Sequence, residues 1–166
     1  MAERGLALVY GGGNVGLMGI VADSVMAHGG AAIGIIPEAL MQKEVGHRGL
    51  TELHIVRNMH ERKQMMADRA DAFIAMPGGV GTFEELFETF TWAQLGYHDK
   101  PVGLLNVAGF YNGMLGFLNH AVSEGFLKQV HADMLHVSTE PEDMLARLAA
   151  APRVHVDKWQ EGREKA

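Results

Sequence analysis

The sequence predicts an α/β fold, in which a doubly wound, mostly parallel sheet of the Rossmann-like type forms the middle of three layers. Short apolar runs alternate with amphipathic stretches of helical length, a pattern typical of parallel sheets with helices on both faces. Most of the 21 glycines follow the apolar runs, where tight turns between strands and helices are needed. The 166 residues suffice for one domain with a core of its own. We expect this domain over residues 1–152 and a charged tail over residues 153–166.

The first half of the chain is expected to contribute three strands and two helices. Residues 2–5 resemble the end of a helix that Gly5 terminates. Segment 38–51 is polar and irregular, as is typical of a loop beside an active site, and Asn58 can cap the helix that follows it. The expected strands are residues 6–10, 32–36 and 53–56, and the expected helices are residues 17–28 and about 59–70.

The second half repeats the alternation of strands and helices. The expected strands are residues 72–76, 102–105 and 134–137, and the expected helices are residues 82–95, 111–124 and 141–150. No repeat, low-complexity segment or linker interrupts this order. The alternation therefore favours a parallel sheet covered by helices on both faces.

Composition excludes several classes of protein. The formal net charge is −6 and the sequence has no basic stripe, which argues against nucleic-acid binding. No apolar run approaches the ~20 residues that span a membrane, and residues 1–4 show no secretion signal. Cysteine is absent, so disulfides and thiolate metal sites are excluded. We therefore expect a cytoplasmic protein that binds neither nucleic acid nor membranes.

Metal and P-loop sites are not indicated either. The nine histidines show no H-E-x-x-H spacing, and His131 and His136 are expected to be structural. The sequence contains no G-x-x-x-x-G-K-[ST] motif, so a P-loop nucleotidase is not expected.

The most informative segment is Pro77-Gly78-Gly79-Val80-Gly81-Thr82-Phe83-Glu84-Glu85, which lies between an apolar run and an amphipathic stretch. Glycine lets the backbone approach an anion closely, and the first turn of a helix offers unpaired N–H groups. The segment therefore predicts a phosphate site with the Glu85 carboxylate one turn inside the helix. Thr82 and Glu85 also fit a capping box, in which the glutamate bonds back to the start of the helix. The sequence leaves both interpretations open.

A second glycine-rich turn follows the first strand. Residues 11–16 match the dinucleotide pattern G-x-G-x-x-G, and Glu38 follows the next strand as the acidic residue of that pattern. Such turns bind many kinds of phosphate, so Gly12 and Gly13, together with Gly78 of the other turn, are candidates for phosphate loops.

A basic pair accompanies these turns. Arg62 lies about one turn after Asn58, at the sheet edge where doubly wound folds bind ligands, so Arg62 and Glu85 can face the same crevice. Taken alone, Arg62 and Lys63 are also compatible with ordinary solvated charges on a helix.

Taken together, these segments match one family signature. Met59-His60-Glu61-Arg62-Lys63 and residues 77–85 fit the pattern P-G-G-x-G-T-x-x-E with an upstream R-K pair. Through them the chain resembles the LOG ("lonely guy") family over nearly its whole length. Residues 9–13 and 16–19 resemble the first glycine loop of that family, and residues 91–101 resemble its smaller, dimeric branch.

The resemblance implies a hydrolase that cleaves the N-glycosidic bond of a prenylated adenosine 5′-monophosphate, releasing the free base (a cytokinin) and ribose 5-phosphate. It implies a homodimer that needs no cofactor, with Arg62 and Glu85 as the catalytic pair. The residues that it implies for substrate binding are Glu44, Lys63, Gly79, Val80, Gly81, Thr82, Phe83, Glu84 and Thr91. The family normally begins with one more strand, loop and helix, so we expect this chain to lack the first strand–helix unit.

Several alternatives stay open. Plain AMP could replace the prenylated nucleotide as substrate, because base selectivity depends on the shape of the pocket. A Rossmann-type oxidoreductase would use the turn at residues 11–16, and a non-catalytic nucleotide-binding module would make Glu85 only a helix cap. Some family members carry the label lysine decarboxylase, which we discount because the sequence shows no lysine site for pyridoxal phosphate.

Overall fold

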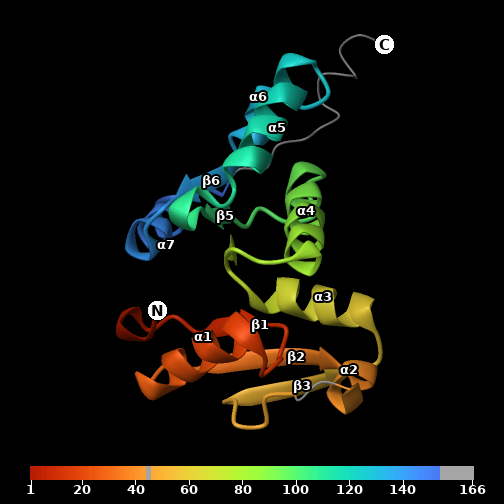
Figure 1. The fold of residues 1–166 in the computed structure, drawn as a ribbon, viewed down its shortest axis with the longest axis vertical. Coiled ribbons are helices and arrows are strands. Elements are labelled where there is room, and N and C mark those ends of the chain that lie inside the picture. Colours follow the sequence, from red (N-terminus) through yellow and green to blue (C-terminus); the bar gives the residue numbers. More distant parts are fainter. Residues whose placement is uncertain (44–45, 154–166) are drawn as a thin grey trace. The chain divides into compact units, whose positions relative to one another are not determined.

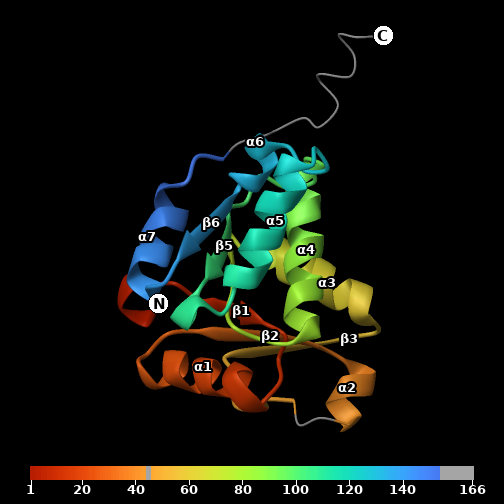
Figure 2. The same ribbon diagram turned by 45° about the horizontal axis from the view of Figure 1, so that its top comes forward.

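The computed structural model describes residues 1–43 and 46–153 (Figures 1 and 2). These residues belong to two compact units, which divide between Ala70 and Asp71. Each unit contains one parallel sheet of three strands, with the order β1-β2-β3 in the first unit and β4-β5-β6 in the second. The units are described one after the other. The expectation of a single domain over residues 1–152 stays a prediction, and most of the expected tail lies outside the described residues.

The first unit begins with a short 3-10 helix whose end was predicted at Gly5. Its elements are η1 (Ala2–Arg4), β1 (Leu8–Tyr10), α1 (Gly16–Ala27), β2 (Ala32–Pro37), α2 (Glu38–Lys43), β3 (Glu52–Val56) and α3 (Met59–Arg69). Both long helices contact the central strand β2. Ala32 packs with Ala22 of α1, and the carbonyl of Ile35 accepts a hydrogen bond from Arg62 of α3. In Figure 2 the two helices lie on opposite faces of this sheet.

The second unit repeats this arrangement. Its elements are β4 (Phe73–Ala75), α4 (Val80–Gln94), β5 (Val102–Leu105), η2 (Val107–Gly109), α5 (Asn112–Ser123), α6 (Gln129–Ala132), β6 (Leu135–Ser138) and α7 (Pro141–Ala150). All four residues of β5 are buried, as expected for a central strand. Leu104 packs in one cluster with Leu86 of α4 and Tyr111, while Leu105 packs with Met144 of α7 on the opposite face.

The predicted fold class is therefore confirmed: both sheets are parallel and both are wound on two faces. The six strands divide between two sheets, a detail that the alternation of elements does not determine. Two helices differ from expectation. Residues 38–43 form the helix α2 instead of an irregular loop, because they are mostly strong helix formers, with Glu38 in the first turn and Lys43 in the last. The short helix α6 was not predicted.

The exposed face of helix α5 leads to a prediction about stability. A Cβ atom added at Gly116 would meet no heavy atom within 4 Å, so glycine weakens this helix without a packing benefit. We expect Gly116→Ala to raise the free energy of unfolding by ~0.5–1 kcal/mol, measured by urea denaturation. Gly125, which follows the helix with φ +78°, is the matched control, because alanine there is strained and should destabilise. A loss of stability in Gly116→Ala would contradict the exposed placement of this face.

The loop before β5 predicts a dependence of stability on pH. The ring of His98 donates from Nε2 to the Thr89 carbonyl (3.0 Å) and accepts at Nδ1 from the Lys100 amide (3.2 Å). Burial lowers the pKa of His98 below its usual range. The unfolded chain therefore takes up the proton first, and stability is lost as the pH falls through about 6.5. We expect a smaller loss in His98→Gln than in the wild type, whereas a variant of the exposed His120 should behave like the wild type in the same urea titrations.

Candidate functional site

Arg62 is positioned by the start of α3. The side chain of Asn58 accepts a hydrogen bond from the Glu61 amide (3.0 Å), which confirms the predicted helix cap. The Glu61 carboxylate bonds back to the amide of Arg57 (2.9 Å), so the chain entering α3 is fixed from both sides. Arg62, one turn into this helix, then reaches the sheet.

The Arg62 guanidinium lies directly against the backbone of the first glycine turn. Its Nε donates to the carbonyl of Ile35 in β2 (3.2 Å), and its Nη1 contacts the sulfur of Met59 (3.2 Å). A Cβ atom on Gly11 would overlap this guanidinium, and the three atoms nearest to it all belong to Arg62. Gly11 has no positive φ, so glycine is needed here for space and not for conformation.

The next two glycines are buried and fixed by neighbouring backbone. Gly12 has φ +73°, and a Cβ atom there would lie 3.2 Å from the Ile35 nitrogen. Its carbonyl accepts a hydrogen bond from the His47 amide (2.9 Å), and Gly13 forms an antiparallel bridge with Gly46. The first turn is therefore a rigid backbone surface beside a guanidinium, an arrangement suited to binding an anion.

The pKa of Tyr10, the residue before this turn, is shifted. Burial, followed by the nearby negative charge of Asp23, raises the pKa of Tyr10 to about 12. The Tyr10 hydroxyl has no hydrogen-bond partner among the described residues. Tyr10 therefore stays neutral at ordinary pH and acts as part of the core under α1.

The other candidates of the first unit are placed less tightly. Lys63 is half-buried on α3, next to Arg62. Glu38 is exposed at the start of α2. Glu44 lies outside the described residues.

In the second unit the glycine turn leads into α4, as predicted, but the helix starts earlier than predicted. Gly79 is the N-cap and has no side chain to occupy the first amides, and the first turn contains no acidic residue. Thr82 is already the third helical residue, so Thr82 and Glu85 do not form a capping box, and that interpretation is wrong. The exposed N-terminus of a long helix without a side-chain cap is suited to an anion.

Position 78 has no room for a side chain, which explains the glycine there. A Cβ atom there would overlap the hydroxyl of Thr82, which folds back over the turn. The Phe83 amide bonds to the Gly79 carbonyl (3.2 Å) and closes the first helical turn. Gly78, Gly79 and Thr82 are therefore brought together at this turn.

The remaining candidates lie along α4. Val80, Gly81, Glu84 and Thr91 are exposed, and Glu85 is half-buried. Glu84 and Thr91 are seven residues apart, which places them on the same face of the helix. The ring of Phe83 is half-buried and packs against Tyr111 (centroids 6.3 Å apart) and the core of the second unit.

Two further contacts escaped the sequence analysis: the Ile35 carbonyl that holds Arg62, and the pair formed by His47 and Asp23 (2.8 Å). For the pair of His47 and Asp23, the sequence offers one signal: a histidine lies between two glycines, within positions 46–49 of the polar segment.

Within residues 1–43 and 46–153, no group of three His, Asp or Glu side chains could hold a metal ion. No helix in this part of the chain is long and apolar enough to cross a membrane.

Comparisons with known proteins agree with this picture. The chain is 57% identical over 129 residues to the cytokinin riboside 5'-monophosphate phosphoribohydrolase LOG of Oryza sativa subsp. japonica, covering 78% of this chain and 53% of that protein. It is 47% identical over 148 residues to LOG1 of Arabidopsis thaliana, covering 89% of this chain and 70% of that protein. Against other curated relatives it spans 61% and 62% of their length.

Two further comparisons concern the fold and the family. The molybdenum cofactor binding protein from Rippkaea orientalis has a similar fold, with a TM-score of 0.66 at 21% identity over 90% of this chain and 79% of that one. A family model described as "Possible lysine decarboxylase" matches residues 18–148. This match, with the identities to the plant enzymes, shows that the chain belongs to the LOG family.

Proposed function

We propose that this protein is a phosphoribohydrolase that cleaves cytokinin riboside 5′-monophosphates, prenylated adenine nucleotides, into the free base and ribose 5-phosphate. The observation that carries the proposal is the 47–57% identity to plant enzymes named for this activity. Both glycine turns, Arg62 and Glu85 fall within the described residues, and both turns have shapes suited to phosphate.

Glu85 is proposed as the group that acts on the ribose. Breaking the bond between C1′ and the base nitrogen builds positive charge on the sugar ring. A carboxylate beneath the ring stabilises this charge and can accept a proton from the attacking water. The carboxylate of Glu85 is half-buried on α4, one turn beyond the amides of Gly81 and Thr82.

Each unit contributes a proposed anion-binding group: Arg62 with the first glycine turn in the first unit, and the start of α4 in the second. The start of α4 offers amides and the positive end of a helix dipole to the 5′-phosphate. Guanidinium groups bind and orient oxygens and do not serve as proton donors, so Arg62 is not proposed to protonate the leaving base. Binding the anionic part of the substrate in one position lowers the entropic part of the barrier.

The proposal is tested by incubating the chain with isopentenyladenosine monophosphate, AMP and lysine. Chromatography should show free isopentenyladenine and ribose 5-phosphate, and no cadaverine. Base release from AMP alone would make the protein an AMP nucleosidase. Nucleotide binding without turnover would overturn the enzymatic function in favour of a binding module, and a nicotinamide cofactor bound in fluorescence titrations would favour the oxidoreductase.

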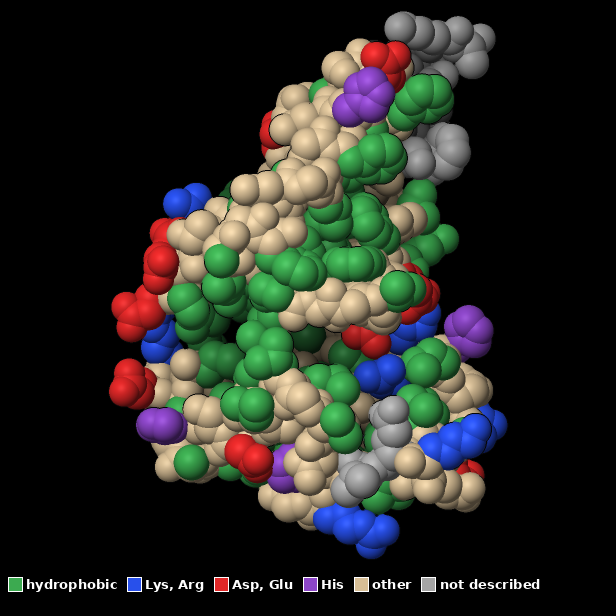
Figure 3. Space-filling view, in the orientation of Figure 1, with side chains coloured by type: hydrophobic (Ala, Val, Ile, Leu, Met, Phe, Trp, Pro, Cys, Tyr) green, Lys and Arg blue, Asp and Glu red, His purple; other side chains and the backbone are tan. Residues whose placement is uncertain are grey.

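The homodimer and the cytoplasmic location expected from the sequence stay predictions. The dimer is supported by large exposed apolar side chains on the second unit, where hydrophobic side chains gather on the face shown in Figure 3. Phe117 is 65% exposed and Phe126 is 91% exposed, and exposed apolar side chains that gather on one face are typical of surfaces that contact another protein. Light scattering after size-exclusion chromatography measures the mass of the assembly, and a monomer at micromolar concentration would contradict the prediction.

A further inference from the structure

A buried histidine connects the polar segment after α2 to helix α1. His47 is 7% exposed, and its Nε2 lies 2.8 Å from Oδ1 of Asp23 in α1. The Gly49 amide donates to Nδ1 (3.3 Å), which leaves the ring proton on Nε2. His47 therefore donates to the Asp23 carboxylate, a charge-assisted hydrogen bond.

The backbone of the same residue supports the first glycine turn. The His47 amide donates to the Gly12 carbonyl (2.9 Å), and the preceding residue, Gly46, bridges Gly13. These two contacts fix the buried glycines that follow Gly11, and the Arg62 guanidinium rests on Gly11. Asp23, His47, Gly12 and Arg62 thus form one connected set of contacts within the first unit.

The two ring nitrogens of His47 have different partners and therefore different roles. The contact from Gly49 spans two residues and shapes only the local turn. The contact to Asp23 joins segments 24 residues apart, and it orients the whole side chain and with it the amide that holds Gly12. Asp23 itself is largely exposed, with 63% of its side chain accessible, so the bond is made at the surface end of a buried ring.

We propose that His47, oriented by Asp23, is a positioning residue that holds the Gly11–Gly13 turn in the shape on which the Arg62 guanidinium rests. The inference rests on the proposed function, because it assigns the turn and Arg62 to the phosphoribosyl part of the substrate. In this role His47 does not itself touch the substrate. It acts through the turn, and its loss should lower the affinity of the protein for the ribose 5-phosphate part of the substrate.

Two substitutions of His47 separate its two contacts. In His47→Gln the side-chain amide can reach the position of Nε2 and keep the bond to Asp23. In His47→Asn the shorter side chain can keep only the local bond from Gly49. We expect His47→Asn to raise both KM and the Kd of ribose 5-phosphate about tenfold or more, and His47→Gln to change them less than about threefold. The value of kcat should change little in either variant.

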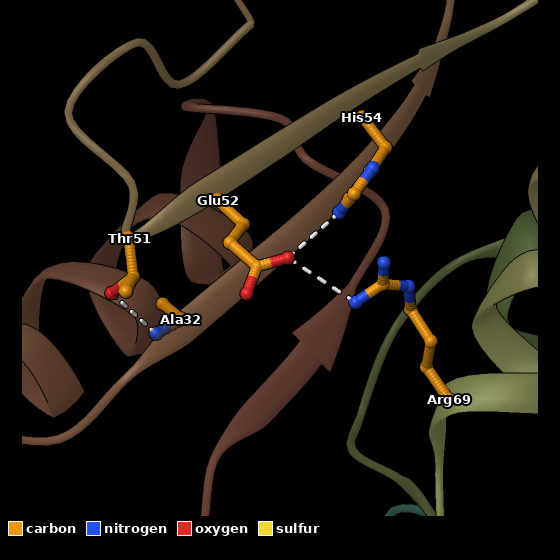
Figure 4. A network of polar contacts seen from close by, with 5 residues as sticks. All are labelled: Ala32, Thr51, Glu52, His54 and Arg69. Carbon is orange, nitrogen blue, oxygen red and sulfur yellow. Dashed lines mark hydrogen bonds and ion pairs between the residues drawn. The ribbon is translucent and has the colours of Figure 1, made fainter.

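A matched control exists on the same sheet. His54 of β3 also pairs with a carboxylate, Glu52, at 2.9 Å, and Arg69 shares that carboxylate at 3.2 Å (Figure 4). None of these contacts reaches the glycine turn. His54→Asn, the counterpart of His47→Asn, removes a histidine–carboxylate pair of nearly the same length (2.9 against 2.8 Å). It should leave KM and the Kd of ribose 5-phosphate unchanged.

Asp23 supplies a second route if His47→Asn does not fold. Asp23→Ala removes the same bond from its exposed side, and Asp23→Asn keeps an oxygen acceptor for Nε2. The inference predicts a raised Kd in Asp23→Ala and a nearly normal Kd in Asp23→Asn. A merely structural role would lower the midpoint of thermal unfolding and the amount of active protein, while KM and Kd of the folded fraction stayed the same.

The outcomes separate the inference from the proposed function. A wild-type chain that binds ribose 5-phosphate without releasing base ends the proposed activity, yet the Kd series still decides the role of His47. Equal Kd values for wild type, His47→Asn and Asp23→Ala overturn the inference while leaving the activity intact. A wild-type chain that neither binds ribose 5-phosphate nor releases base overturns both.

Discussion

Glu85→Gln is expected to lower kcat for base release by about 10²–10⁴-fold, because glutamine keeps the shape of the side chain but can neither accept a proton nor offset developing positive charge. The measurement is initial-rate chromatography of the free base from isopentenyladenosine monophosphate. KM should change little, since the neutral nucleotide sugar gains its charge only in the transition state.

The start of α4 removes one folding explanation for this loss. Helix α4 begins at Val80 with Gly79 as its cap, so Glu85 makes no capping-box contact. Urea denaturation of Glu85→Gln, measured on the same preparation, separates a loss of chemistry from a loss of folding. Glu88, one turn further along the same helix, provides the matched control, and Glu88→Gln should retain activity. Comparable rates for Glu85→Gln and the wild type would remove Glu85 from the reaction.

Elements with a strong local signal could be predicted from the sequence. Strand β5 and helix α7 have the predicted bounds. Strand β5 is a short apolar run, and α7 begins with a proline, which suits the first turn of a helix. Asn58 was recognised as a cap for the same reason: its side chain satisfies an amide only three residues away.

The start of α4 shows where local reasoning fails. Thr82 followed three residues later by Glu85 carries the sequence signature of a helix start, whereas a glycine cap has no side chain to announce it. The helix nevertheless begins at Val80, because the glycine turn sets the direction of the chain. The cap that sequence rules favour is thereby replaced by open amides, which suits a site for an anion.

The contacts that shape the site could not be predicted at all. Arg62 meets the Ile35 carbonyl and the backbone of Gly11, and His47 meets Asp23. Each contact joins elements distant in the sequence and exists only because α1 and α3 pack on opposite faces of one sheet. Spacing identified Arg62 as a candidate, but its partners follow from tertiary packing alone.

The contact between Gly11 and the Arg62 guanidinium leads to the second prediction of a large effect on activity. Gly11→Ala is expected to lower kcat/KM for base release about 10–100-fold, because the new methyl group would occupy the place of the guanidinium. A displacement of a positioning group by about 1 Å can cause a loss of this size. The fold should survive, since Gly11 has no positive φ and the atoms that must move belong to the end of a flexible side chain. Steady-state kinetics and urea denaturation of the same preparation measure both quantities, with Gly116→Ala as the alanine control away from the site.

A double-mutant cycle decides whether Arg62 transmits the effect. If the methyl group acts by displacing the guanidinium, Gly11→Ala should cost almost nothing more in an Arg62→Ala background, where there is no guanidinium to displace. The two losses in kcat/KM would then be strongly non-additive, as expected for residues in direct contact. Additive losses would mean that the methyl group disturbs the turn itself, and that the space above Gly11 serves a purpose other than seating Arg62.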